Sequence, residues 1–151
     1  METSVQIHER WQDIGDLRAV IALIASAGIA REIESLLKAA LDGNGQCVLT
    51  LARDGEACIA FAFANRGIGL ESGGGYLWIN ELFVKEEYRR RAVASTLLAS
   101  LEAWARKRHF KRIILAANPT NRAALALYGK AGFCVESAAW LEKELQDTRM
   151  T

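Results

Sequence analysis

Apolar residues recur at two different spacings along the chain, which predicts a mixture of helices and strands. Steps of three and four residues within Asp13 to Ala27, and again within Ile29 to Leu41, indicate two consecutive amphipathic helices. The runs Gln46 to Arg53 and Glu56 to Asn65 are rich in strand-forming residues and flank Asp54-Gly55, a pair typical of a type I′ hairpin turn. Both runs are partly apolar on both sides, so we expect helices on each face of the sheet.

The second half of the chain continues with strands and helices in alternation. Tyr76 to Val84 is predicted as the central strand, and Lys111 to Ala117 as the next one, with a buried run from Ile113 to Leu115. The residues Asn118-Pro119-Thr120-Asn121 form a helix-start signal, since Asn or Thr can cap a helix. This short helix runs to about Lys130, and Gly132 is placed to end it.

The complete predicted order is β–α–α–β–β–β–α–β–α–β–β. This order predicts a mixed α/β architecture, with residues 1–151 as one domain around a mixed central sheet flanked by helices on both faces. The five glycines within Arg66 to Gly75 indicate a mobile loop. Three further strands are expected, at Val5 to Glu9, Phe133 to Ser137 and Ala139 to Leu145.

Composition and charge narrow the classes of function. A chain of 151 residues with 51% hydrophobic and 25% charged residues is typical of a soluble globular protein. The net charge is only +1, so no nucleic-acid partner is expected. Positive charge is instead concentrated at Arg89 to Arg91 and from Arg106 to Arg112, which favours a local anionic ligand.

The three cysteines, Cys47, Cys58 and Cys134, lie in apolar runs without close spacing. We expect reduced, buried thiols in a cytoplasmic protein and no metal site. The N-terminus lacks the apolar core of a signal peptide, and the longest apolar run, near Ala19 to Ala30, is too short to span a membrane. The sequence does not choose between a monomer and a homodimer.

The stretch from Glu81 to Ala99 combines a strand, a charged turn and the start of a long helix. The first backbone N–H groups of a helix have no intrahelical partner, and the macrodipole makes that end positive. The arginine triplet beside this end supplies the charge that a phosphate ligand needs. The buried face of the helix is predicted to carry Val93, Leu97, Leu98, Leu101, Trp104 and Ala105.

Two motifs here resemble the GNAT superfamily of N-acetyltransferases. Arg89-x-x-Ala92-x-Ala94, after a strand, is similar to the acetyl-CoA signature Gln/Arg-x-x-Gly-x-Gly/Ala. About 30 residues later, Asn121-Arg-Ala-Ala-Leu-Ala-Leu-Tyr128 followed by Gly132-Phe133 is similar to the family's Asn-x-x-Ala-x-x-Leu-Tyr and Gly-Phe. The predicted element order is also that of the family, and the likeness is strongest from Tyr76 to Phe133.

The resemblance implies a site for acetyl-CoA. The pantetheine arm would pair with the backbone of the central strand, and the pyrophosphate would bind the N–H groups from about Arg90 to Ala94. Asn121 resembles an asparagine that contacts the cofactor, although a helix cap accounts for it equally well. The cofactor-binding residues expected on this basis are Leu82, Phe83, Val84, Arg89, Arg90, Arg91, Ala92, Val93, Ala94, Asn121 and Tyr128.

Ala92 departs from the family pattern, which usually has glycine at this position. Glycine lets a backbone approach a pyrophosphate closely, and alanine replaces it at little cost only where φ is negative. We expect a helical, negative φ at Ala92, because it stands at a helix start. On that expectation the alanine is tolerated and its N–H remains free for phosphate.

The resemblance also implies catalytic roles. Tyr128 matches the family's general acid, which protonates the leaving thiolate, although a core tyrosine is the alternative. Glu81 is the candidate base for the amine, with a structural carboxylate as the alternative. Side chains alternate along a strand, so Asn80 and Glu81 are expected on opposite faces unless a bulge intervenes. Glu71 is a second candidate base. Trp78 and Tyr76 share a strand face that can border the acceptor site.

These residues predict an N-acetyltransferase that moves the acetyl group of acetyl-CoA to a primary amine by direct attack in a ternary complex, without a metal. One alternative is a CoA-binding module, regulatory or catalytically degenerate, which Ala92 suggests. A second alternative is a protein acetyltransferase that acts on lysines or N-termini. No feature of the sequence identifies the amine.

Overall fold

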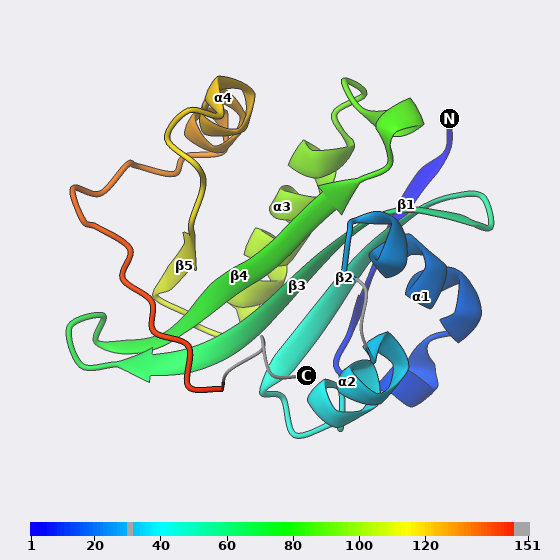
Figure 1. Ribbon diagram of the computed structural model, residues 1–151, viewed down its shortest axis with the longest axis horizontal. Helices are drawn as coiled ribbons and strands as arrows, with labels where there is room; N and C mark the ends of the chain where they lie inside the picture. Colours follow the sequence, from blue (N-terminus) through cyan, green and yellow to red (C-terminus); the bar gives the residue numbers. More distant parts are fainter. Residues whose placement is uncertain (30–31, 147–151) are drawn as a thin grey trace.

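The computed structural model describes residues 1–29 and 32–146. A five-stranded sheet in the order β1-β2-β3-β4-β5 lies between two layers of helices (Figure 1), as expected for the predicted mixed α/β architecture. The predicted fold class is therefore confirmed. In chain order the elements are β1 (Thr3–His8), η1 (Trp11–Asp13), α1 (Leu17–Ser26), α2 (Ile33–Ala40), β2 (Cys47–Asp54), β3 (Ala57–Gly69), β4 (Gly74–Val84), η2 (Glu86–Tyr88), α3 (Val93–Lys107), β5 (Arg112–Leu115) and α4 (Arg122–Lys130).

The sheet is antiparallel from β1 to β4, and only the pair β4–β5 is parallel. One face packs against α1 and α2 through a cluster that includes Leu49, Leu51 and Phe61. The opposite face packs against α3 and α4 through Leu77 and Ile79 together with residues of both helices. Burial on both faces explains why the central strands are nearly continuous apolar runs.

The helix α1 starts later than its apolar periodicity predicts. The predicted helix began at Asp13, whereas residues 11–13 form a 3-10 turn and α1 begins at Leu17. The carboxylate of Asp16 accepts a hydrogen bond from the N–H of Ala19 at 3.1 Å, which caps the helix. A side-chain cap therefore decides the start, because it replaces one missing backbone partner.

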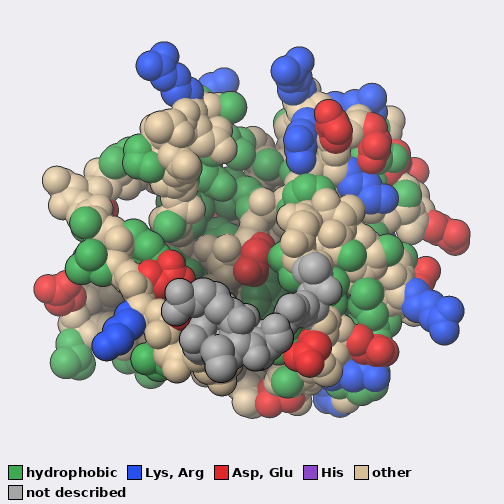
Figure 2. All heavy atoms as spheres, in the orientation of Figure 1, with side chains coloured by type: hydrophobic (Ala, Val, Ile, Leu, Met, Phe, Trp, Pro, Cys, Tyr) green, Lys and Arg blue, Asp and Glu red, His purple; other side chains and the backbone are tan. Residues whose placement is uncertain are grey.

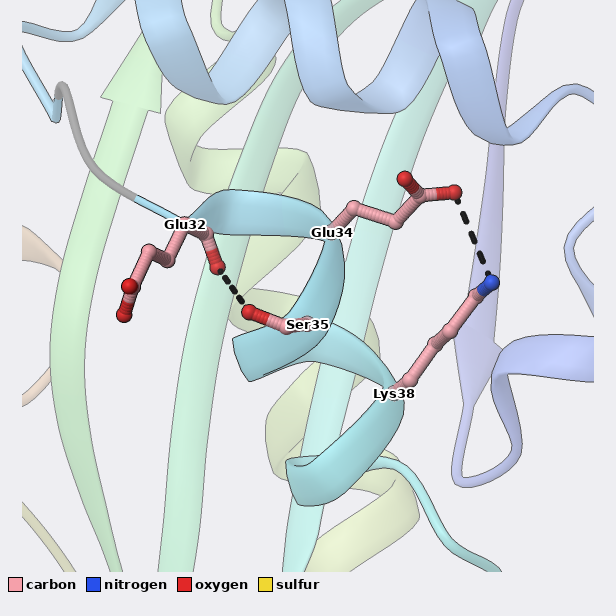
Figure 3. A network of polar contacts seen from close by, with 4 residues as sticks. All are labelled: Glu32, Glu34, Ser35 and Lys38. Carbon is pink, nitrogen blue, oxygen red and sulfur yellow. Dashed lines mark hydrogen bonds and ion pairs between the residues drawn. The ribbon is translucent and has the colours of Figure 1, made fainter.

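The helix α2 is short and carries one hydrogen bond and one ion pair on its surface (Figure 3). The hydroxyl of Ser35 donates to the carbonyl of Glu32 at 3.1 Å, and Lys38 Nζ lies 3.4 Å from Glu34 Oε1, one helical turn away. Glu32 precedes the helix in the left-handed region, with φ 51°. Of the predicted helix from Ile29 to Leu41, residues 30 and 31 lie outside the described residues, and the helix itself is Ile33–Ala40.

The glycine-rich stretch from Arg66 to Gly75 is mostly strand, with a turn at residues 70–73, so the prediction of a loop over the whole stretch was wrong. β3 continues to Gly69 and β4 begins at Gly74, with Arg66 paired to Leu77 and Gly67 paired to Tyr76. A Cβ added at Gly67 would lie 2.4 Å from the ring of Tyr76. The glycine is there because the aromatic ring of the neighbouring strand crosses it, a packing reason that composition does not reveal.

The turn between β2 and β3 also differs in type. Asp54 pairs with Ala57, so Gly55 and Glu56 are the central residues of the turn. Gly55 has φ 61°, whereas Glu56 is not among the residues with positive φ. A type I′ turn requires positive φ at both central positions, and glycine at the first position alone fits type II′. The predicted hairpin is therefore correct and its predicted turn type is wrong.

The two helices on the second face follow the sequence closely. Val93, Leu97, Leu98, Leu101 and Ala105 are buried in α3, whereas Trp104 is only half-buried and stacks on Phe110. At the end of α4 the N–H of Gly132, with φ 94°, donates to Gly129, and the N–H of Phe133 donates to Tyr128 at 2.9 Å. This pair of bonds is a Schellman motif, which confirms Gly132 as the end of the helix.

The last two predicted strands are not formed. Residues 133–146 contain no strand or helix, and most of their side chains are exposed. The strand β5 is shorter than predicted and pairs only with β4, so Ile113 to Leu115 are half-buried instead of buried. Among the described residues β5 has no partner on its outer side and remains the edge of the sheet, because residues 133–146 do not add a strand there.

The cysteines lie in three different environments. Cys58 is buried, Cys47 is half-buried and Cys134 is exposed, so the prediction of burial fails at Cys134. Cys134 lies in the segment that was predicted to be a strand, and its exposure has the same cause. Among the described residues, none of the helices is both long and apolar enough to cross a bilayer.

Candidate functional site

The open edge of β4 is the centre of the candidate site. β5 pairs only with Tyr76 to Ile79, whereas β4 continues to Val84. On their other side Leu82, Phe83 and Val84 pair with β3. Beyond Ile79, therefore, the outer edge of β4 has no strand partner among the described residues, and the chain leaves β5 towards α4 (Figure 1). An unpaired edge of this kind can accept an extended ligand as an extra strand.

Six consecutive backbone N–H groups lie at the end of this edge. Within the described residues, the N–H groups of residues 90 to 95 make no hydrogen bond, and the first bond of α3 is from Thr96 to Ala92. No side chain caps the helix. Arg90 and Ala92 both have left-handed backbones, with φ 64° and 61°. Alternation of this kind turns successive N–H groups towards one side and forms a concave anion site.

The expectation of a helical Ala92 was therefore wrong. With φ 61° and ψ 18°, Ala92 is the residue before the helix, in the left-handed region that favours glycine. The family's glycine and the alanine of this chain thus share a strained position. The strain is of the order of 1 kcal/mol for a residue with a Cβ.

The three arginines of the loop are exposed but do not play equal parts. Arg89 turns back towards the strand, where its Nε donates to the carbonyl of Val84 at 3.0 Å and its guanidinium lies 5.7 Å from the ring of Phe83. Arg91 lies over the ring of Tyr88 at 5.7 Å. Arg90 and Arg91 remain beside the free N–H groups, whereas Arg89 ties the loop to the end of β4.

A cavity of about 270 Å³ lies between the splayed strands and the helices α3 and α4. Figure 2 shows that this face of the molecule is hollowed between α4 and the start of α3, with hydrophobic side chains on the floor and Lys or Arg side chains on both sides of the rim. Basic residues at the rim and an apolar interior suit a ligand with an anionic end and an apolar arm. The cavity is lined by residues that include Ile79, Ser95, Leu98, Ile113, Lys130 and Phe133. Ser95 and Lys130 were not predicted as site residues, because neither stands at a position that the two motifs specify.

Tyr128 and Asn121 lie on α4. Tyr128 is half-buried against the α3 side of the core and meets Phe133 edge-on, with ring centroids 5.8 Å apart. Burial raises the pKa of Tyr128, so its hydroxyl keeps its proton at neutral pH. The side chain of Asn121 accepts from the N–H of Ala124 at 3.1 Å, which is the helix-cap alternative.

A β-bulge decides where Glu81 points. Ile79 pairs with Ala64 and Glu81 pairs with Phe63, so Asn80 is an extra residue in β4. Glu81 therefore lies on the same face as Phe63, towards α1 and α2. The sequence left open whether a bulge intervenes between Asn80 and Glu81, and the structure has one. The side chain keeps an exposed part, but partial burial raises the pKa of the Glu81 carboxyl. A carboxylate with a raised pKa is a stronger base.

Glu71, the second candidate base, is not brought to this site. It lies in the turn between β3 and β4, whereas Glu81 is seven strand residues beyond the start of β4. At about 3.3 Å per residue, that is roughly 20 Å along the strand. Among the residues that the structure describes, no group of three or more His, Cys, Asp or Glu is arranged to hold a metal ion.

Comparisons with known proteins agree with this arrangement. Streptothricin acetyltransferase A of Bacillus subtilis (strain 168) is 28% identical over 86 residues, which are 54% of this chain and 50% of the relative. The match thus spans about half the length of that relative. An aminoglycoside acetyltransferase from an uncultured soil metagenomic sample, in complex with sisomicin, has a TM-score of 0.82 at 13% identity over 95% of this chain and 97% of its own.

A further solved structure has the same fold. AAC(6')-Iy, in complex with the bisubstrate analogue CoA-S-monomethyl-acetylneamine, has a TM-score of 0.76 at 17% identity over 95% of this chain and 99% of its own. Residues 11–133, which include the open edge, the arginine loop and α4, match the profile of the Acetyltransferase (GNAT) family. Since this match covers most of the chain, the protein belongs to the Acetyltransferase (GNAT) family.

Proposed function

We propose that the protein is an N-acetyltransferase that moves the acetyl group of acetyl-CoA to a primary amine, with residues 1–151 acting as one domain. The observation that carries the proposal is the open edge of β4 from Asn80 to Val84, which ends at the free N–H groups of residues 90 to 95. In this proposal the pantetheine arm pairs with Leu82 to Val84. The pyrophosphate binds the N–H groups beside Arg90 and Arg91.

The proposed chemistry is one direct transfer in a ternary complex. Glu81, directly or through water, accepts a proton from the bound ammonium, because only the neutral amine has a lone pair. The amine nitrogen then attacks the thioester carbonyl carbon, a C–N bond forms, the C–S bond breaks, and the nitrogen loses its second proton to solvent. Tyr128 gives its proton to the leaving thiolate. Its raised pKa supports this role, since the hydroxyl is protonated and available at neutral pH.

A thiol-release assay over a panel of amine classes tests the proposal. We expect CoA release that depends on both acetyl-CoA and amine, with no release when the amine is omitted, because direct transfer has no acetyl-enzyme intermediate. Tyr128→Phe should lower kcat about tenfold and leave acetyl-CoA affinity unchanged, since the ring fills the same space. A loss of thermal stability with normal kcat would instead mean that Tyr128 is only a core residue.

The base role of Glu81 has a distinct pH signature. Because the pKa of Glu81 is raised, the carboxyl becomes a competent base only above that raised value. Glu81→Gln should therefore lose most rate between the pKa of Glu81 and that of the amine, where wild type has a base and the amine still carries its proton. A ratio of mutant to wild-type kcat/KM that does not change with pH would contradict the role.

One observation favours a CoA-binding module without catalysis as the second candidate. Ala92 occupies a left-handed position that the family fills with glycine, so the loop carries strain in the free protein. This candidate predicts that the chain binds CoA in calorimetry and releases no thiol with any amine of the panel. Both measurements together therefore separate the two functions.

A further inference from the structure

The bulge at Asn80 brings an aromatic side chain next to the candidate base. Trp78 pairs with Asn65 and Glu81 pairs with Phe63, and these two partners are two residues apart on β3. Residues two apart on a strand point to the same face, so Trp78 and Glu81 are consecutive side chains on one face of β4. Their separation along the strand is about 7 Å. Without the bulge, Trp78 would instead share its face with Asn80.

The C-terminal segment adds a second indole to this place. Trp140 stacks on Trp78 with ring centroids 5.1 Å apart and an interplanar angle of 24°. Residues 133–146 form no strand or helix, so Trp140 contacts the sheet from an irregular segment, whereas Trp78 is held in β4. Trp140 is nevertheless 63% exposed, so a large part of its ring surface is open to a ligand.

The charge of the segment indicates the sign of that ligand. Residues 133–146 carry three glutamates, Glu136, Glu142 and Glu144, and one lysine, Lys143, all of them exposed. Three negative charges and one positive charge give a net −2 for this described stretch. A cation is attracted both by these carboxylates and by the faces of indole rings. The basic residues Arg89 to Arg91 lie instead at the end of β4, where the proposed cofactor site begins.

We propose that Trp78, Glu81 and Trp140 form the acceptor subsite and that it takes an arylalkylamine, a primary ammonium joined to a flat apolar body. The ammonium is received by Glu81, and the flat body lies on the exposed surface of Trp140. Trp140 is then the residue that determines specificity, and the C-terminal segment is one wall of the site. This inference rests on the proposed N-acetyltransferase function.

The test compares three probe amines, tryptamine, propylamine and spermidine, in the thiol-release assay with the full chain. Wild type should prefer tryptamine to propylamine by about tenfold or more in kcat/KM, because only tryptamine can stack. Trp140→Ala should remove this preference by raising KM for tryptamine about tenfold. The readout is the ratio of kcat/KM for tryptamine to kcat/KM for propylamine, and KM for acetyl-CoA should change less than about twofold, because the cofactor binds elsewhere.

Two variants serve as controls. Trp140→Phe should retain most of the tryptamine preference, because an aromatic face remains. Trp104→Phe alters a tryptophan that stacks on Phe110 at the other end of α3 and should change no amine preference. Loss of stacking in Trp140→Ala should also reduce the near-ultraviolet circular dichroism more than in Trp104→Phe.

Each result decides between the inference and its alternatives. Equal losses for all three amines in Trp140→Ala, or a wild type that prefers spermidine or propylamine, overturn the arylalkylamine subsite. Acetylation of a peptide N-terminus with none of the three amines accepted also overturns it, while leaving the N-acetyltransferase function standing. If wild type fails to bind acetyl-CoA in calorimetry, the proposed function itself fails.

Discussion

The helices α3 and α4 both border the cavity of the candidate site, but they begin in opposite ways. At α4 the side chain of Asn121 accepts from Ala124, as Asp16 accepts from Ala19 at the start of α1. At α3 no side chain caps the helix, and the residue before it, Ala92, is left-handed. A side-chain cap satisfies one of the first N–H groups of a helix, whereas an uncapped start keeps that donor for another acceptor.

The comparison teaches that a missing cap can be a functional feature. The α3 start lacks a partner for six consecutive N–H groups within the described residues and has arginines on its surface. Unsatisfied donors cost stability unless water or a ligand satisfies them. Substitutions at Ala92 and Asn121 change the two helix starts themselves, and substitutions at Arg89 and Arg91 separate the contributions of these two side chains to the α3 start.

The largest expected effect comes from Ala92→Asp, which adds a carboxylate to the start of α3. A fixed negative charge beside the N–H groups competes with the pyrophosphate and repels it, and CoA affinity should fall more than about a hundredfold. Isothermal titration calorimetry with CoA measures this loss. Ala92→Asn is the matched control, because it is neutral and tolerates a left-handed backbone. If the folded Asp variant binds CoA as wild type does, the phosphate does not bind here.

The second prediction separates Arg89 from Arg91. Arg89 acts through its bond to Val84, so Arg89→Ala should lower CoA affinity about tenfold, whereas Arg89→Gln retains a donor and most of the affinity. The family signature, which accepts glutamine or arginine here, agrees with a donor role. Arg91 acts through its charge, so Arg91→Gln and Arg91→Ala should be equally weak.

Calorimetry at two salt concentrations completes this comparison. The affinity of the Arg91 variants should depend less on salt than that of wild type, because the lost interaction is a screened charge pair. Should Arg89→Gln be as weak as Arg89→Ala, Arg89 would be a phosphate ligand and not a positioning residue.

The third prediction removes the cap of α4. Asn121→Ala should lower the free energy of unfolding by about 1 kcal/mol, measured by urea denaturation, because the N–H of Ala124 loses its acceptor. CoA affinity should change less than about threefold. Asn121→Ser is the control that keeps a cap. A large loss of CoA affinity at unchanged stability would favour the cofactor contact that the family resemblance implies.

The smallest effect is expected for Ala92→Gly. The glycine relieves a left-handed backbone, so the free energy of unfolding should rise by about 0.5–1 kcal/mol. CoA affinity should change by less than about tenfold, because the N–H groups stay where they are. If the glycine variant binds CoA and the natural protein does not, the natural loop is degenerate. The chain is then an inactive member of the family and not an acetyltransferase.

Local patterns in the sequence determined the architecture and most of the element order. The periodicity of α3 predicted its buried face apart from Trp104, and Gly132 and Asn121 predicted both ends of α4. These features depend on residues a few positions apart, so their effects can be recognised without the rest of the chain. The two motifs likewise identified the family, since each combines a local structure with a fixed spacing.

Only the tertiary structure decided the details that position the candidate site. The bulge at Asn80 turns Glu81 to the face of Trp78, and the left-handed Ala92 corrects the helical backbone predicted for it. Tyr76 packs across Gly67 where a loop was predicted, and residues 133–146 do not pair with the open edge of β5. In each case the deciding contact joins residues on different elements. Local propensity carries no information about such contacts, because they form only when the elements pack.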